Sequence, residues 1–404
     1  MRNYIYSIVC LCAALLCSSI SSAQDKVKKP LGSGIVNFID QDSTWSVKVS
    51  GMMQFLAATS INNNDGSHEL ASTFAPRRIR LKLGGFAYTP KLNYFLQLGF
   101  SEQDMVGINP DNSHNTELIY DAYIRWSFFR NCELKFGQFK LPGNAERMIS
   151  SANMQFVDRS IMNSAMNIDR DMGLMLSHPF YLKNNFVVRD YWAFTQGEGE
   201  GVTNGNEGGY NYTARLELLP LGEFAGDGEY KGSAFGLEPR VKLMLGCTYN
   251  FNDEAIRTKG QLGKYMLIDD GADFHHSDMT NILLDAVLRY QRWSFLAEYG
   301  RRSANNPEAF NSDGSEAGFT VPEGNAYNVQ GGFLFPSNWE LSARYSEAYF
   351  KHNVYNGEAK RCGTVAISRY IVQHKLKVQG DFSHFSYGGG INSSLARLHF
   401  VLQF

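Results

Sequence analysis

The sequence has few cysteines and, beyond its first residues, no long apolar run. Six cysteines occur in 404 residues, and those outside the first 23 are Cys132, Cys247 and Cys362, at wide spacing. Three isolated thiols exclude a disulfide framework and a zinc-site pattern. No run of about eighteen or more apolar residues follows the N-terminal segment, which excludes a transmembrane helix. If the chain crosses a membrane, it must do so as a closed β-barrel, because only helices and barrels satisfy every backbone group in lipid.

The chain also lacks a strong charge of either sign. It has 38 Lys and Arg against 40 Asp and Glu, a formal net charge of −2, which excludes a strongly basic nucleic-acid-binding protein. No G-x-S-x-G or H-E-x-x-H motif occurs, so we predict no catalytic residues. No cofactor or metal is expected either, and we interpret the acidic group as a solvated loop; its members are Asp269, Asp270, Asp273, His275, His276 and Asp278.

The N-terminus has the pattern of an export signal. Arg2 precedes an apolar stretch over residues 5–20, and Ser21 and Ala23 occupy the small-residue positions read by a signal peptidase. We predict that residues 1–23 form a cleaved signal peptide and that residues 24–44 form a periplasmic N-terminal segment. Residues 45–404 are then left for the folded unit.

Most of residues 45–404 alternate between apolar and polar side chains, which is typical of β-strands. One example is a strand in which Ile79, Leu81 and Leu83 alternate with Arg78, Arg80 and Lys82. Tight turns such as 88–91 and 129–132 alternate with longer polar segments such as 60–75 and 101–116. Short and long connections in alternation are typical of outer-membrane barrels. We predict an all-β fold, a transmembrane antiparallel β-barrel of about sixteen strands, wide enough for an aqueous lumen.

If the apolar faces contact lipid, the alternate residues line the lumen. Arg78, Arg80 and Lys82 then form a column on one strand, which we call the basic column, and Arg125 joins it as a pore-lining cation. Successive weak sites of this kind suit anion conduction. The alternative is that these cations form salt bridges within the wall, such as Arg125 with Asp121 or Lys135 with Glu133.

Residues 141–169 form a long segment between two predicted strands. A loop of this length is usually functional, and we predict that it folds into the barrel as a constriction loop. Its charged residues are Glu146, Arg147, Asp158 and Arg159. In that position they would set the selectivity of the pore.

Three stretches resemble a known family. The first is Phe136-Gly137-Gln138-Phe139-Lys140-Leu141-Pro142, the second is Pro220-Leu221-Gly222-Glu223-Phe224, and the third is the aromatic-ended run from Ala396 to Phe404. Together they are similar to the phosphate-selective porin O and P family, in a form resembling those of Bacteroidetes-type bacteria. The resemblance implies a loop folded inside the barrel, basic residues at the constriction of phosphate-selective members, a trimer, and insertion by the barrel-assembly machinery.

We therefore expect an outer-membrane porin for passive diffusion of small hydrophilic solutes. Because residues 141–169 are mixed in sign and lack a dense lysine cluster, we expect a modest general anion preference, with phosphate as one candidate solute. The expected partners are outer-membrane lipid and small anions, without nucleic acid. Two alternatives stay open, a barrel enzyme such as a lipase or protease, and a pore-less barrel that serves adhesion through its loops.

Overall fold

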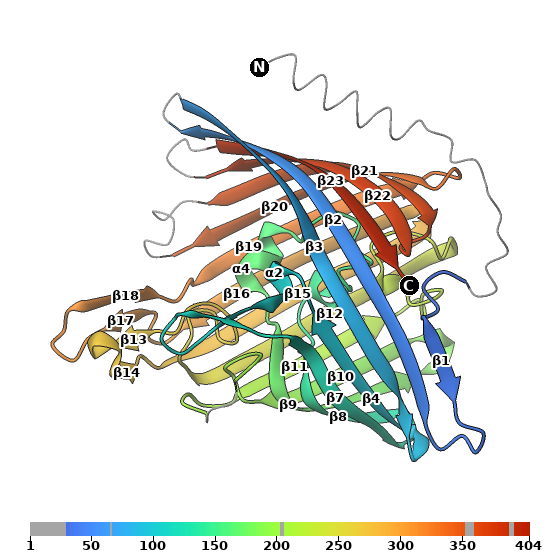
Figure 1. Ribbon diagram of the computed structural model, residues 1–404, viewed down its shortest axis with the longest axis horizontal. Coiled ribbons are helices and arrows are strands. Elements are labelled where there is room, and N and C mark those ends of the chain that lie inside the picture. The colour runs from blue at the N-terminus through green and yellow to red at the C-terminus, as the bar shows by residue number, and fades with distance from the viewer. Residues whose placement is uncertain (1–29, 65–66, 203–205, 352–358, 388–391) are drawn as a thin grey trace.

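The computed structural model describes residues 30–64, 67–202, 206–351, 359–387 and 392–404. Within them, sixteen antiparallel strands close into one barrel (Figure 1). The strands are β2 (Ser46–Asn64), β3 (Ser67–Ala87), β4 (Thr89–Gly99), β7 (Ile119–Phe129), β8 (Cys132–Lys140), β9 (Arg170–Tyr181), β10 (Val187–Thr195), β11 (Asn211–Leu219), β12 (Glu238–Ala255), β15 (Ser277–Gln291), β16 (Trp293–Ala304), β19 (Gly324–Leu334), β20 (Trp339–Phe350), β21 (Lys360–Val372), β22 (Leu376–Ser386) and β23 (Asn392–Gln403). The predicted fold class and strand number are confirmed. The predicted signal peptide lies outside the described residues.

The first and last strands of the barrel meet at a seam. β2 and β23 pair in antiparallel register from Met52 with Gln403 onward. At its end, the Gly51 amide donates to the Phe404 carbonyl at 2.8 Å, and the Phe404 amide donates to the Gly51 carbonyl at 2.9 Å. Beyond this point a short strand, β1 (Val36–Ile39), pairs with the start of β2. β1 thus pairs with the start of β2, which β23 does not reach. It lies within the segment predicted to be periplasmic.

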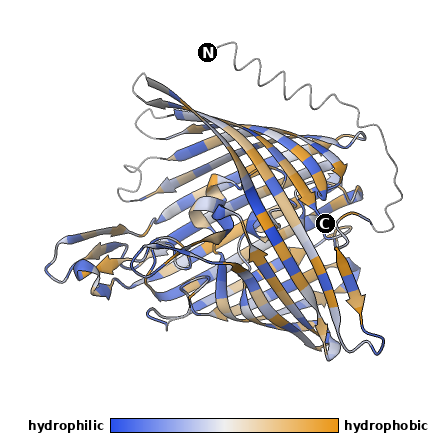
Figure 2. Cartoon of the chain, viewed as in Figure 1, coloured by the Kyte–Doolittle hydropathy of each residue, from blue (hydrophilic) through white to orange (hydrophobic). Residues whose placement is uncertain are grey.

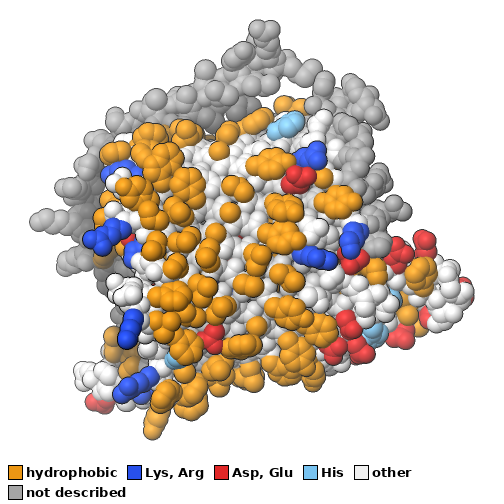
Figure 3. Space-filling view, turned by 180° about the vertical axis from the view of Figure 1, so that it is seen from behind, with side chains coloured by type: hydrophobic (Ala, Val, Ile, Leu, Met, Phe, Trp, Pro, Cys, Tyr) orange, Lys and Arg blue, Asp and Glu red, His pale blue; other side chains and the backbone are white. Residues whose placement is uncertain are grey.

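Alternation along the strands separates a polar interior from an apolar exterior. In β15, Asn281 and Asp285 are buried, whereas Ile282 and Leu284 between them point outward and are exposed. In Figure 2, hydrophilic and hydrophobic residues alternate along the strands. In Figure 3, apolar side chains cover the outer wall of the barrel and charged ones gather mainly at its margins. An exterior of this kind matches the hydrocarbon layer of a membrane.

Short turns join most of the strand pairs at one end of the barrel, and the connection from β11 to β12, residues 220–237, is the long exception. Three of the short turns contain an asparagine with positive φ: Asn131 (58°), Asn184 (59°) and Asn338 (60°). Asparagine adopts this left-handed conformation more readily than most residues, because its short polar side chain bonds to nearby backbone. The chain therefore reverses direction within a few residues at these points.

The connections at the other end are longer and contain small elements of their own. These are α2 (Glu102–Met105), β5 (Val106–Ile108), β6 (His114–Thr116), α3 (Ala145–Met148), α4 (Ile161–Met166), β13 (Leu267–Ile268), η3 (Asp269–Gly271), β14 (Asp273–Phe274), β17 (Glu308–Phe310) and β18 (Glu316–Thr320). Two further one-turn helices, η1 (Lys183–Asn185) and η2 (Gly228–Tyr230), lie in the connections after β9 and β11. No helix among the described residues is long and apolar enough to cross a membrane.

The predicted loop at 60–75 is wrong. β2 continues to Asn64 and β3 begins at Ser67, and the two pair throughout, for example Asn62 with Glu69. The polar composition suggested a loop, but strand residues that extend past the membrane no longer need an apolar face. The hairpin therefore projects beyond its neighbours, as its length in Figure 1 shows.

Candidate functional site

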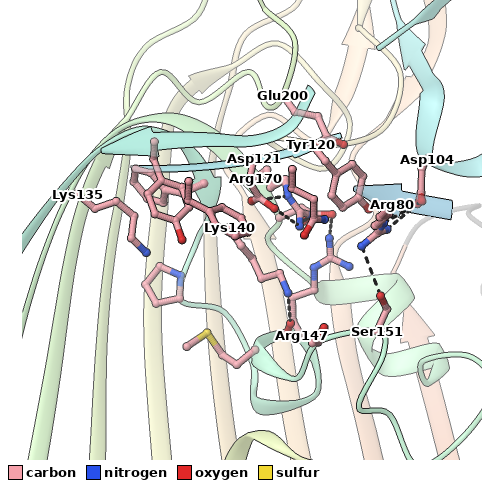
Figure 4. Close-up of a pocket in the computed structure, with 18 of the residues that line it drawn as sticks. Arg80, Asp104, Tyr120, Asp121, Lys135, Lys140, Arg147, Ser151, Arg170 and Glu200 are labelled. Carbon is pink, nitrogen blue, oxygen red and sulfur yellow. Dashed lines mark hydrogen bonds and ion pairs between the residues drawn. The ribbon is translucent and has the colours of Figure 1, made fainter. Parts of the chain in front are cut away.

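Strands β3, β4, β7 and β8 form one wall of a cavity of about 520 Å³, which we call the first cavity (Figure 4). Its cations are Arg78, Arg80, Lys135, Lys140, Arg147, Arg159 and Arg170, and its acids are Asp104, Asp121, Asp169 and Glu200. Seven cations against four acids give the lining a positive balance, although the whole chain is slightly acidic. Positive charge in a water-filled passage raises the local concentration of anions.

Tyr120 lies at the centre of this cavity, between two arginines. The guanidinium carbons of Arg80 and Arg170 lie 3.9 and 3.7 Å from the centroid of its ring. Simple alternation with Asp121 and Arg125 would place Tyr120 on the lipid-facing side of β7, but its ring lines the first cavity. A register shift between Gln97 and Leu98 in the pairing of β4 with β7 breaks the alternation there. Figure 4 shows the ring inside the cavity, beside both arginines.

Two members of the basic column have acidic partners. Arg80 donates to both carboxylate oxygens of Asp104 in α2, through Nε at 2.8 Å. Arg78 donates to the Gln54 side chain at 3.0 Å, and its guanidinium lies 3.8 Å from Asp158. Both arginines line the first cavity, but part of their charge is neutralised by carboxylates from distant segments.

Two lysines of this wall, Lys82 and Lys135, have no such partner in the part of the chain that the structure describes, whereas Lys140 donates to the Arg147 carbonyl at 3.0 Å. Among the described residues, neither Lys82 nor Lys135 forms a hydrogen bond or an ion pair. Lys135 stands over ring faces, with Nζ 4.8 Å from the centroid of Tyr123 and 5.4 Å from that of Phe139. In Figure 4 it stands apart from the arginine pairs, and no dashed line reaches it.

The two salt bridges offered as an alternative are wrong. Arg125 lies 3.6 Å from Glu133, not beside Asp121. Asp121 instead accepts two hydrogen bonds from Arg170, at 2.9 and 3.1 Å. This leaves Lys135 without the predicted partner.

The charged side chains of segment 141–169 form hydrogen bonds or ion pairs with other residues. Glu146 accepts hydrogen bonds from Ser160, by the hydroxyl at 2.6 Å, and from Arg344 at 3.3 Å. Arg147 forms an ion pair with Asp169. Arg159 donates to the backbone carbonyls of Glu146 and Ile149, at 3.2 and 2.8 Å.

Asp158 forms ion pairs with three arginines. It lies 2.6 Å from Arg77, 2.7 Å from Arg397 and 3.8 Å from Arg78. These three arginines come from β3 and β23, the strands on either side of β2. Asp158 therefore holds segment 141–169 against this part of the wall and neutralises charge there.

Acids of the opposite wall hold the backbone of the same segment. The Glu146 amide donates to Glu298 at 2.7 Å, and the Ala145 amide donates to Asp285 at 3.2 Å. Helix α4 packs its Met162 and Met166 into an apolar cluster with Leu283. Strand acids that look like lumen charges in the sequence are thus used as hydrogen-bond acceptors for the segment.

A second cavity of about 580 Å³ lies nearer the short turns. Lys48, Lys82 and Arg125 line it, together with Phe38 of β1. Phe95 and Tyr123 line both the first and the second cavity. Phe95 was not singled out from the sequence, although its position between Asn93 and Gln97 on the polar face of β4 is a signal that could have found it.

Glu200, in the connection between β10 and β11, lines the first cavity. Its Oε2 atom is buried and makes no hydrogen bond. Burial raises the pKa of this carboxyl above its ordinary value, and Glu117 adds to the rise, while Arg170 and Arg147 oppose it. Glu200 was not predicted as a site residue.

The acidic external group is part of the loop structure. Asp269 accepts hydrogen bonds from the Ser312 amide, at 2.8 Å, and from its hydroxyl. In the part of the chain that the structure describes, no three His, Cys, Asp or Glu side chains are grouped so as to hold a metal ion.

The barrel is similar to solved porins. The anion-selective porin from Comamonas acidovorans aligns with a TM-score of 0.55 and 12% identity, over 89% of this chain and 100% of its own. The outer membrane channel DcaP of Acinetobacter baumannii aligns with a TM-score of 0.52 and 12% identity, over 92% and 100%. OmpT of Vibrio cholerae, in its trimer form, aligns with a TM-score of 0.51 and 12% identity, over 89% and 99%.

These identities establish the fold alone, and no curated protein matches the sequence. A family model, described as phosphate-selective porin O and P, matches residues 47–386. That range contains fifteen of the sixteen barrel strands in nearly their full length, including the strands β3, β4, β7 and β8 that form one wall of the first cavity. The chain therefore belongs to the phosphate-selective porin O and P family and is an outer-membrane channel.

Proposed function

We propose that this channel lets small hydrophilic solutes diffuse passively and prefers anions. The observation that carries the proposal is the excess of cations in the first cavity; among the described residues, Lys135 in that cavity and Lys82 in the second cavity are left unpaired. An unpaired cation beside water attracts anions more strongly than one that a carboxylate has neutralised. The family's name makes phosphate one candidate solute.

We further propose that segment 141–169 crosses the lumen as the constriction loop. Its hydrogen bonds reach Glu298 and Asp285 on one side and, through Asp158, the arginines of β3 and β23 on another. A segment tied to separate parts of the wall would confine solutes to the side lined by β3, β4, β7 and β8. The basic column and Arg125 would then line the remaining path.

Several other proposals follow from the N-terminal sequence and from family membership. Residues 1–23 act as a signal peptide, residues 24–44 as a periplasmic segment, and the barrel-assembly machinery inserts the barrel into outer-membrane lipid. The trimer form of OmpT supports a trimer here as well. A source among Bacteroidetes-type bacteria stays a prediction. The family and the similar folds are those of channels, which favours a channel without enzymatic activity over the barrel-enzyme and adhesion alternatives.

The test is planar-bilayer recording of the purified protein under a salt gradient. Stepwise conductance with an anion-selective reversal potential is expected. Lys82→Gln and Lys135→Gln should each lower the anion-to-cation permeability ratio, by about two-fold if the lysine lies about 8 Å from the permeating ion in water. Lys91→Gln, which removes an exposed lysine near the start of β4, is the matched control and should change nothing.

A cation-selective reversal potential would refute the anion preference but not the channel function. A folded barrel without conductance would refute the channel and favour the enzyme or adhesion alternatives. Block by phosphate at concentrations where chloride does not block would narrow the solute to phosphate.

A further inference from the structure

The two cavities meet at a pair of aromatic rings, Phe95 and Tyr123, which we call the aromatic pair. The residues are directly opposite each other in the pairing of β4 with β7. Their ring centroids lie 5.2 Å apart, with an angle of 31° between the planes. Because both rings line both cavities, a solute that moves from one cavity to the other passes over them.

A cation stands next to the aromatic pair. Lys135 Nζ lies 4.8 Å from the Tyr123 centroid and 5.4 Å from that of Phe139, a third ring on the same wall. Within the described residues no carboxylate pairs with Lys135. Its charge is therefore available to a solute, unlike that of Arg80, which Asp104 neutralises.

This combination is poorly suited to a small inorganic anion alone. Such an ion is strongly hydrated and loses hydration, without compensation, where it passes apolar ring faces. A flat aromatic group instead gains contact area and offset-stacked or edge-to-face contacts against the rings. An anion that carries such a group can satisfy the rings and the lysine at the same time.

We infer that the junction of the two cavities is a binding site for small aromatic anions, in which the aromatic pair holds the ring and Lys135 holds the charge. The solute class consists of aryl carboxylates and aryl phosphates. The inference rests on the proposed channel function and makes it more specific. It predicts that an aryl ester of an anion is bound better than the anion itself.

The test compares phenyl phosphate with inorganic phosphate. In bilayers, phenyl phosphate should block the chloride current at a concentration about two- to ten-fold lower than phosphate, the factor expected for one aromatic contact. Titration calorimetry of the protein in detergent should give the same order of affinity, and it does not depend on conductance.

Variants locate the site. Phe95→Leu and Tyr123→Leu should each weaken phenyl phosphate binding by about two- to ten-fold and change phosphate binding by less than about two-fold. Lys135→Gln should weaken the binding of both anions. Phe136→Leu is the matched control, because Phe136 lies on the outer face of β8 with 55% exposure.

The results separate the two proposals. Equal binding of phenyl phosphate and phosphate, in a channel that conducts anions, would overturn the aromatic site alone. Equal losses in Phe136→Leu and Phe95→Leu would do the same. Absence of conductance with preferential binding by calorimetry would refute the channel and retain the site.

Discussion

Arg215 of β11 donates two hydrogen bonds to Asp285 of β15, at 2.7 and 2.9 Å, and neither side chain is exposed. The two strands are not neighbours, because β12 lies between them. Arg215 also donates to the Gly143 carbonyl at 2.7 Å, and Asp285 accepts from the Ala145 amide. This pair therefore fixes the start of segment 141–169 to the wall.

Breaking the pair should destabilise the protein and loosen the segment. Arg215→Met leaves the Asp285 carboxylate buried without its partner, which should lower the free energy of unfolding by about 3–5 kcal/mol. The double variant Arg215→Met with Asp285→Leu removes both charges and should lose less. Urea unfolding followed by tryptophan fluorescence measures the free energy of unfolding of both variants. A double variant less stable than the single variant would contradict the explanation.

Asp158 is expected to limit the anion preference. Asp158→Asn removes one negative charge between Arg77, Arg78 and Arg397 while keeping a hydrogen-bond acceptor. The anion-to-cation permeability ratio should rise about two-fold, the effect of a unit charge about 8 Å away in water. Reversal potentials measure the ratio. Asp313→Asn makes the same change in net charge on an exposed external loop and should have no effect.

Glu200 should make selectivity depend on pH. Burial raises the pKa of its carboxyl, so on acidification it is neutralised at a higher pH than an ordinary glutamate. Its loss of charge makes the first cavity more positive, and anion preference should rise about two-fold as the pH falls from neutral through this raised pKa. In Glu200→Gln the ratio should be high already at pH 7 and lack this step. A similar step in Glu200→Gln would assign the titration to another group.

Gly137 should be essential for assembly of the barrel. It has a φ of 129°, and a Cβ there would lie 2.2 Å from the Ala122 carbonyl and 2.8 Å from the Tyr123 Cα. Gly137→Ala should therefore cost about 3 kcal/mol or more, through strain and displacement of β7. Heat-modifiable mobility on electrophoresis reports the folded fraction. Gly363→Ala, where nothing lies within 4 Å of the added carbon, should fold normally.

Strand positions could be predicted from the sequence because each strand faces lipid on one side and polar surroundings on the other. That contrast fixes the alternation in β3 and with it the inward direction of Arg78, Arg80 and Lys82. The contrast is lost where strands leave the membrane, which is why the polar ends of β2 and β3 have the composition of a loop.

The partners of those cations could not be predicted. Asp104 reaches Arg80 from α2, and Asp158 reaches Arg77 and Arg397 from segment 141–169. Contacts between a connection and a distant strand depend on the path of the connection, which periodicity does not encode. The inward position of Tyr120 follows from a register shift between β4 and β7, which alternation on a single strand cannot show.

The seam between β2 and β23 joins residues from opposite ends of the folded chain, as the reciprocal bonds of Gly51 and Phe404 show. These residues are far apart in the sequence, and contacts between distant residues form slowly because the intervening chain must first be ordered. Until the seam closes, β2 and β23 expose unpaired edges that can pair with other chains. Closure of the seam is therefore the step at which newly made protein is most exposed to aggregation and most dependent on assistance.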